Sequence, residues 1–136
     1  MMTVLNHGVV TAEALVLDTP VSFWGGFDPM TGKILEASHP QRGQALHGKV
    51  LVMPYAKGSS GTPAGVAESI RVGTGPAAIV LGQPDANIAV GAKVASQLYD
   101  IDVPVIAVAP IQYAAFQTSQ YWHIDTQQGV LSHVPA

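Results

Sequence analysis

The sequence predicts a mixed α/β fold, with a small parallel sheet, crossover helices and a β-rich layer. In the middle of the 136-residue chain, three short apolar runs alternate with two helical patterns, an order typical of parallel strands joined by crossover helices. The flanking segments, residues 4–17 and 121–134, are rich in apolar and β-branched residues and indicate strands. At this length we expect one domain over residues 1–136.

Each element has its own signal along the chain. Residues 4–17 predict two strands or one bent strand, because His7-Gly8 interrupts the apolar pattern. The first helix should start at Pro63 and stop at Gly73, since proline is favoured in a first helical turn and glycine just past a last one. We expect the last segment to form a hairpin around residues 126–128. The middle unit is predicted as strands at 49–53, 77–81 and 103–108 and helices at 63–72 and 88–99.

Composition excludes several classes of function. Charged residues make up 11% of the chain, against about 25% in a typical soluble domain, which favours a large buried interface with another subunit. A Gly/Ala-rich soluble domain without such an interface is the alternative. The net charge of −3 and the lack of Lys/Arg runs argue against nucleic-acid binding. No apolar run approaches the ~18 residues of a membrane span. No signal peptide is visible, so we expect a cytoplasmic protein.

The segment from Lys49 to Gly73 is the most informative for function. It runs from an apolar strand through the loop Gly58-Ser59-Ser60-Gly61 into a helix. Free amides and the helix dipole make such a helix start a site for an anion, and a serine hydroxyl there could bind a carboxylate or exchange a proton. The loop lacks the Walker GK[ST] and the Gly-x-Ser-x-Gly elbow. The structural alternative is that its hydroxyls cap the helix.

Other candidate sites are weaker. Gly25-Gly26 lies between aromatic residues and suggests a close backbone approach to a ligand or a partner, whereas Asp28 before Pro29 is best explained by an Asx-turn. The five histidines show no helical pair spacing and the chain has no cysteine, so we expect no metal site on this chain. No histidine or carboxylate pair stands beside the serines, and a serine without a base usually needs help from another chain.

Five stretches stand out together and in this order: residues 20–32, His39-Pro40 with Gly43, residues 48–54, Lys57-Gly58-Ser59-Ser60 and residues 76–81. Together they resemble the small subunit or swivel domain of the aconitase X family. The resemblance extends from about Gly8 to Val108 and fades from Ala109 onward. It implies a swivelling β/β/α domain and a hydro-lyase, which removes water from a hydroxy acid after taking a proton next to a carboxylate. It also implies a large subunit that carries an iron–sulfur cluster and most of the site, with this chain inactive alone.

The resemblance also implies residue roles. Ser59 corresponds to the family's catalytic serine, the base for the substrate proton, and Ser60 is the alternative. Lys57 could stabilise the alkoxide, bind a carboxylate or be solvated, while Gly58 and Gly61 would let the backbone pack against substrate. Pro63 removes one amide from the anion-binding turn. The motif Ser22-Phe23-Trp24-Gly25-Gly26 looks more like the bacterial members of the family, which favours cis-3-hydroxy-L-proline as substrate over mevalonate 5-phosphate. A non-catalytic swivel module and a stand-alone binder of small molecules remain alternatives.

Overall fold

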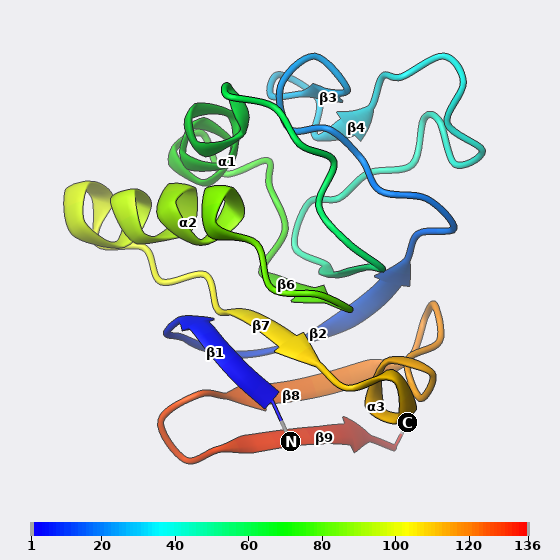
Figure 1. Cartoon of the computed structure of the whole chain (residues 1–136), viewed down its shortest axis with the longest axis vertical. Helices are drawn as coiled ribbons and strands as arrows, with labels where there is room; N and C mark the ends of the chain where they lie inside the picture. Colours follow the sequence, from blue (N-terminus) through cyan, green and yellow to red (C-terminus); the bar gives the residue numbers. More distant parts are fainter. Residues whose placement is uncertain (1, 136) are drawn as a thin grey trace.

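Helices, a largely parallel sheet and a β-hairpin form three layers in the computed structural model, which describes residues 2–135 (Figure 1). In that view α1 and α2 lie on one side of the central strands, and the orange-to-red pair β8 and β9 lies on the other. The predicted mixed α/β class and its β/β/α layers are confirmed. The elements are β1 Met2–Asn6, β2 Val9–Val16, β3 Phe27–Asp28, β4 Lys33–Ile34, β5 Val50–Met53, α1 Thr62–Arg71, β6 Ala78–Leu81, α2 Ala86–Tyr99, β7 Val105–Val108, α3 Pro110–Tyr113, β8 Tyr121–Asp125 and β9 Val130–Val134.

One strand connects the two β layers. The main sheet has the order β1-β7-β6-β5-β2-β8-β9. The end of β2, from Ala14 to Val16, runs parallel to β5, whereas its start, from Val9 to Glu13, runs antiparallel to β8. The flanking segment therefore forms two strands, β1 and β2, and β8 with β9 forms the expected hairpin. The β-rich flanks are continuous with the parallel strands.

The central strands are buried on both faces. Residues of β5, β6 and β7 alternate between a core under the helices and a core against the hairpin, because successive strand side chains point to opposite faces. In β5, for example, Leu51 packs on the helix side and Val52 on the hairpin side. This double burial explains why the sequence shows continuous apolar runs rather than alternation.

The helices start and stop close to the predicted positions. α1 begins one residue before Pro63 and ends before Gly73, whose φ of +79° suits glycine. Asp85 caps α2 by accepting a hydrogen bond from the Ile88 amide at 2.9 Å. Within residues 2–135 no helix is long and apolar enough to cross a membrane.

Two short elements were not predicted. β3, Phe27–Asp28, lies in the aromatic–glycine segment, where no strand was predicted, and pairs with β4. α3 lies in the tail after Ala109, where no element was predicted before residue 121. A two-residue strand and a single helical turn are too short to show a periodic pattern, so neither could be predicted from the sequence.

Candidate functional site

Ser59 forms a turn that leads into α1. Its Oγ accepts a hydrogen bond from the Gly61 amide at 3.2 Å, and its carbonyl oxygen accepts one from the Thr62 amide at 3.1 Å. The residue is half-buried, while Ser60 is exposed and its hydroxyl makes no hydrogen bond to the described residues. Gly61 is the N-cap of α1, which has no side-chain cap bond. The alternative that the serine hydroxyls cap this helix is therefore wrong.

The start of α1 offers fewer free donors than the sequence suggested. The Gly61 and Thr62 amides are both turned toward oxygens of Ser59, and Pro63 has no N–H. Few backbone amides at this helix start are therefore free to bind an external anion. The positive end of the helix dipole is instead directed at the oxygens of Ser59 itself.

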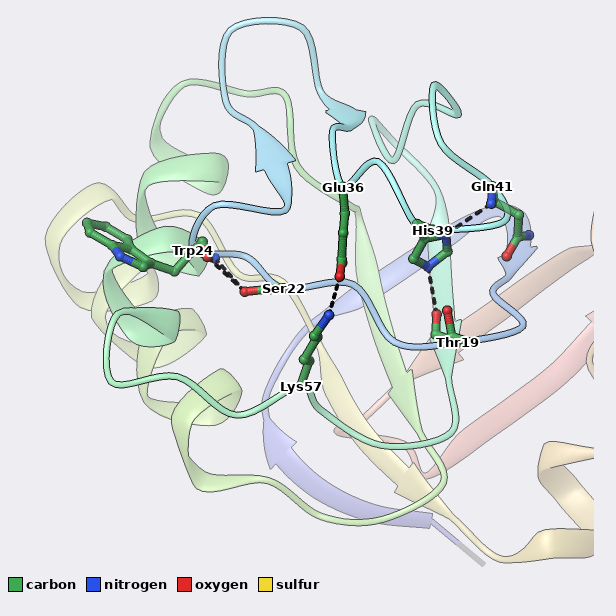
Figure 2. A network of polar contacts seen from close by, with 7 residues as sticks. All are labelled: Thr19, Ser22, Trp24, Glu36, His39, Gln41 and Lys57. Carbon is green, nitrogen blue, oxygen red and sulfur yellow. Dashed lines mark hydrogen bonds and ion pairs between the residues drawn. The ribbon is translucent and has the colours of Figure 1, made fainter.

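Lys57, two residues before Ser59, forms an ion pair with Glu36 (Figure 2). The two side chains come from different loops and point toward each other, with 46% of the Lys57 and 23% of the Glu36 side chain exposed. The second carboxylate oxygen, Glu36 Oε2, is buried and has no hydrogen-bond partner among the described residues. Sequence analysis left open whether Lys57 is simply solvated, and the structure shows that it is paired.

The Lys57–Glu36 pair lines a pocket of about 350 Å³. The other lining residues are Thr19, Pro20, Ser38, His39, Pro40 and Tyr55. They belong to three loops, the ones that follow β2, β4 and β5. The pocket is therefore built by the same loop that carries Ser59, together with segments far away in the sequence.

His39 is a structural residue in the wall of this pocket. It is 5% exposed, its Nδ1 accepts a hydrogen bond from the Gln41 amide at 3.0 Å, and its Nε2 lies 2.9 Å from the Thr19 carbonyl (Figure 2). Because an amide can only donate and a carbonyl can only accept, Nε2 carries the proton and the ring is neutral. Both nitrogens are used, so His39 has no free nitrogen with which to activate Ser59.

The aromatic–glycine segment packs on the start of α1. A Cβ on Gly61 would lie 2.4 Å from the Trp24 ring, and one on Gly65 would lie 2.1 Å from the Phe23 carbonyl oxygen. A second pocket, of about 360 Å³ and with a mainly apolar lining, lies between the aromatic–glycine segment and α1. The contacts with α1 are made by Phe23 and Trp24, not by Gly25-Gly26: a Cβ on Gly25 would meet nothing within 4 Å, and one on Gly26 would lie 2.8 Å from the Ser22 carbonyl oxygen. A ligand or partner at these two glycines stays a prediction.

The two specific predictions in this segment have different outcomes. Gly25 has a φ of +95° and open space around it, so the turn requires it for its backbone conformation. Asp28 accepts hydrogen bonds from the Met30 amide at 2.9 Å and the Thr31 hydroxyl at 3.0 Å. The Asx-turn is thus confirmed, and no carboxylate oxygen of Asp28 is free of a protein donor.

The residues that the structure describes do not fit an iron–sulfur cluster. The chain has no cysteine, and residues 2–135 hold no group of three His, Cys, Asp or Glu placed to bind a metal ion. Any cluster that serves this site would need ligands from another chain.

Comparison with known proteins identifies the family. The family model described as the aconitase X swivel domain matches residues 2–133. This chain belongs to the aconitase X swivel-domain family. The swivel domain also superposes on the crystal structure of Thermococcus kodakaraensis aconitase X (holo-form) with a TM-score of 0.84 and 28% identity, covering 97% of this chain and 95% of that one. The resemblance stated from sequence, and the fold it implied, are confirmed. Its expected end near Val108 is wrong, because the family match continues to residue 133.

Relatives of the swivel domain fall into two groups. It is 39% identical over 101 residues to the cis-3-hydroxy-L-proline dehydratase of Pseudomonas aeruginosa, an alignment that covers 74% of this chain and only 17% of that protein. It is 37% identical over 92 residues to the phosphomevalonate dehydratase small subunit of Methanothermobacter thermautotrophicus, covering 68% of this chain and 70% of the other. The two identities are too close to choose between the groups.

The structure brings together most of the residues that the sequence singled out. Lys57, Gly58, Ser59, Ser60 and Gly61 form one loop at the start of α1. Their roles stay predictions, since their placement alone does not test them. Sequence analysis missed Glu36, a lone acidic residue 21 positions before its partner, for which no local pattern gave a signal.

Proposed function

We propose that this chain is the small subunit of a hydro-lyase that dehydrates a hydroxy acid. The relatives in the family carry the names of dehydratases, which supports this class of reaction. The observation that carries the proposal on this chain is Ser59, a half-buried serine at the start of α1 whose Oγ accepts a backbone amide. The resemblance stated from sequence implies that Ser59 corresponds to the family's catalytic serine.

In this proposal Ser59 Oγ removes the proton from the carbon next to the substrate carboxylate. The electrons of that C–H bond form a carbon–carbon double bond, and the hydroxyl group on the adjacent carbon leaves with its own bonding electrons, takes up a proton and departs as water. A neutral hydroxyl is a weak base at pH 7, so the serine must react as an alkoxide that its surroundings stabilise.

Two features of the chain support an alkoxide at Ser59 rather than at Ser60. The Gly61 amide donates to Ser59 Oγ at 3.2 Å, and the positive end of the α1 dipole lies next to it. Ser60 is exposed, and its hydroxyl has no such donor among the described residues. Gly58 and Gly61 would let the loop pack closely on substrate, with Ser60 and Lys57 as further contacts.

The remaining parts of the site are proposed to come from a large aconitase X subunit. This chain offers no cysteine for an iron–sulfur cluster, so we assign the cluster to that partner. The charged fraction of 11% supports an extensive interface between the two. On this basis the isolated chain should bind substrate weakly and turn nothing over.

The favoured substrate is cis-3-hydroxy-L-proline, with mevalonate 5-phosphate as the alternative. Lys57 is the only Lys or Arg between Val50 and Ile70, and it is already paired with Glu36. A phosphate monoester carries a charge of about −1.5 to −2 at pH 7 and is usually met by several cationic groups. This loop supplies no such cluster, which supports the substrate without a phosphate.

The test is a dehydration assay on this chain co-expressed with a candidate large aconitase X subunit from the same organism, with each subunit alone as a control. We expect turnover of cis-3-hydroxy-L-proline by the pair only, and a loss of about 10²–10⁴-fold in kcat for Ser59→Ala, the range that an acid–base group contributes. Ser60→Ala is the matched variant and should stay within a few-fold of wild type.

Two outcomes would count against the proposal. Full activity of the Ser59→Ala complex would remove the catalytic role of this residue. A stable complex that dehydrates neither substrate would favour the alternative from another class, a non-catalytic swivel module that only binds its partner.

A further inference from the structure

The ion pair between Lys57 and Glu36 is poorly explained by stability. Partly exposed pairs contribute little to folding, and here one carboxylate oxygen, Glu36 Oε2, is buried without a donor among the described residues, which is unfavourable. A neutral side chain such as glutamine would avoid a buried, unpartnered anionic oxygen. Stability therefore does not account for a charged side chain at position 36, and ligand binding in the pocket is the other role that the charge could have.

The position of the pair suggests that explanation. Lys57 is the loop's own cation, two residues before Ser59, and nearly half of its side chain is open to solvent. Alone it would attract any anion, and a doubly charged phosphate more strongly than a singly charged carboxylate. With Glu36 in contact, the pair has no net charge, so its attraction for a multiply charged ligand is much reduced. The pocket can still donate a hydrogen bond from the lysine.

We propose that Glu36 is a specificity-determining residue that cancels the charge of Lys57 and so selects substrates with one carboxylate against phosphorylated ones. This inference rests on the proposed function for its substrates, and it names Glu36 as the reason why a phosphorylated hydroxy acid is disfavoured. An amino acid such as hydroxyproline has one carboxylate and one ammonium group and no net charge, which matches the neutral pair.

The first test needs no turnover. Backbone amides of Gly58, Ser59 and Gly61 are followed by ¹H–¹⁵N NMR while the full chain is titrated with inorganic phosphate at constant ionic strength. Glu36→Gln should tighten the phosphate Kd by about tenfold, the effect of removing one nearby negative charge. In the double variant Glu36→Gln/Lys57→Gln this gain should disappear, because Glu36 acts through Lys57.

A matched control is available at the other end of β5. Glu13 and Lys49 form an ion pair of 2.9 Å with side chains 32% and 31% exposed. Glu13→Gln removes the same charge from a similar environment away from Ser59, and it should leave the phosphate Kd unchanged. Equal tightening in Glu13→Gln, no tightening in Glu36→Gln, or a gain that survives in the double variant would each overturn the proposal.

The second test uses the two-subunit complex. In Glu36→Gln the ratio of kcat/KM for mevalonate 5-phosphate to that for cis-3-hydroxy-L-proline should rise about tenfold over wild type. A loosened loop would instead lower both values together and leave the ratio unchanged, which would contradict a role in specificity. If the wild-type complex dehydrates neither substrate, the proposed function fails, while the phosphate titration still decides whether Glu36 screens Lys57.

Discussion

Gly65 stands in the middle of α1, where alanine would normally form a better helix by about 1 kcal/mol. The structure predicts the opposite result for Gly65→Ala. An added Cβ would lie 2.1 Å from the Phe23 carbonyl oxygen and 2.7 Å from its carbon, about 1 Å inside normal contact. Both atoms belong to the backbone, so no side chain can rotate away, and the helix must move off the segment that carries Trp24.

The net effect follows from two opposing contributions. Overpacking typically costs about 1–3 kcal/mol, and more when backbone must shift, so after the gain in helix propensity we expect a loss of about 2 kcal/mol. For a chain of this size that corresponds to a Tm lower by roughly 6–10 °C. Gly58→Ala is the control, because its Cβ would meet nothing within 4 Å and should leave stability unchanged or slightly raised. Thermal and urea unfolding of both variants measure this, and a Gly65→Ala chain as stable as wild type would refute the close packing of α1 on Phe23.

Two further predictions concern the polar contacts. His39→Ala removes the hydrogen bonds to Thr19 and Gln41 and should lower the free energy of unfolding by about 1–3 kcal/mol. Urea denaturation measures this, with His47→Ala, at an exposed position, as the control. An equal effect in both variants would contradict the structural role of His39. The Glu13 carboxyl has a pKa below its usual value of 4.5, because Lys49 donates a hydrogen bond to it and attracts its charge. The folded chain therefore binds fewer protons at Glu13 than the unfolded chain, so this stabilisation is present above about pH 4.5 and is lost as the pH falls through the lowered pKa. The difference in urea midpoint between wild type and Glu13→Gln should shrink on acidification from pH 7, and a constant difference would show that the ion pair does not contribute.

Sequence analysis predicted the fold well where the signal is local. Pro63, Gly73 and the cap at Asp85 fix helix ends through backbone chemistry that depends on a few neighbouring residues, and the structure places the ends within a residue or two of the prediction. Parallel strands buried on both faces show as plain apolar runs. The pairing of β2, by contrast, involves two partners, β5 and β8, that are far apart in sequence, and no local pattern predicts it.

The same distinction explains what sequence analysis could and could not say about the site. Its loop is a contiguous motif, so Ser59 and its neighbours could be named from the sequence. The contacts that decide how this loop behaves are not contiguous. Glu36 and Lys57 are 21 residues apart in sequence. Trp24 and Gly61 are 37 residues apart, and they come into contact only when the segment after β2 packs on α1.

The loop's electrostatics therefore differ from those that its composition suggests. From the sequence alone, a lysine beside two serines and a helix start indicates a site for any anion. In the structure the amides at the helix start serve the oxygens of Ser59 and the lysine is neutralised by Glu36. A loop arranged in this way can stabilise one negative charge at the serine without attracting a strongly charged ligand. In the proposed function such a loop would combine support for an alkoxide with discrimination against phosphate, and Glu36→Gln should weaken the second property while leaving the Ser59–Gly61 contact in place.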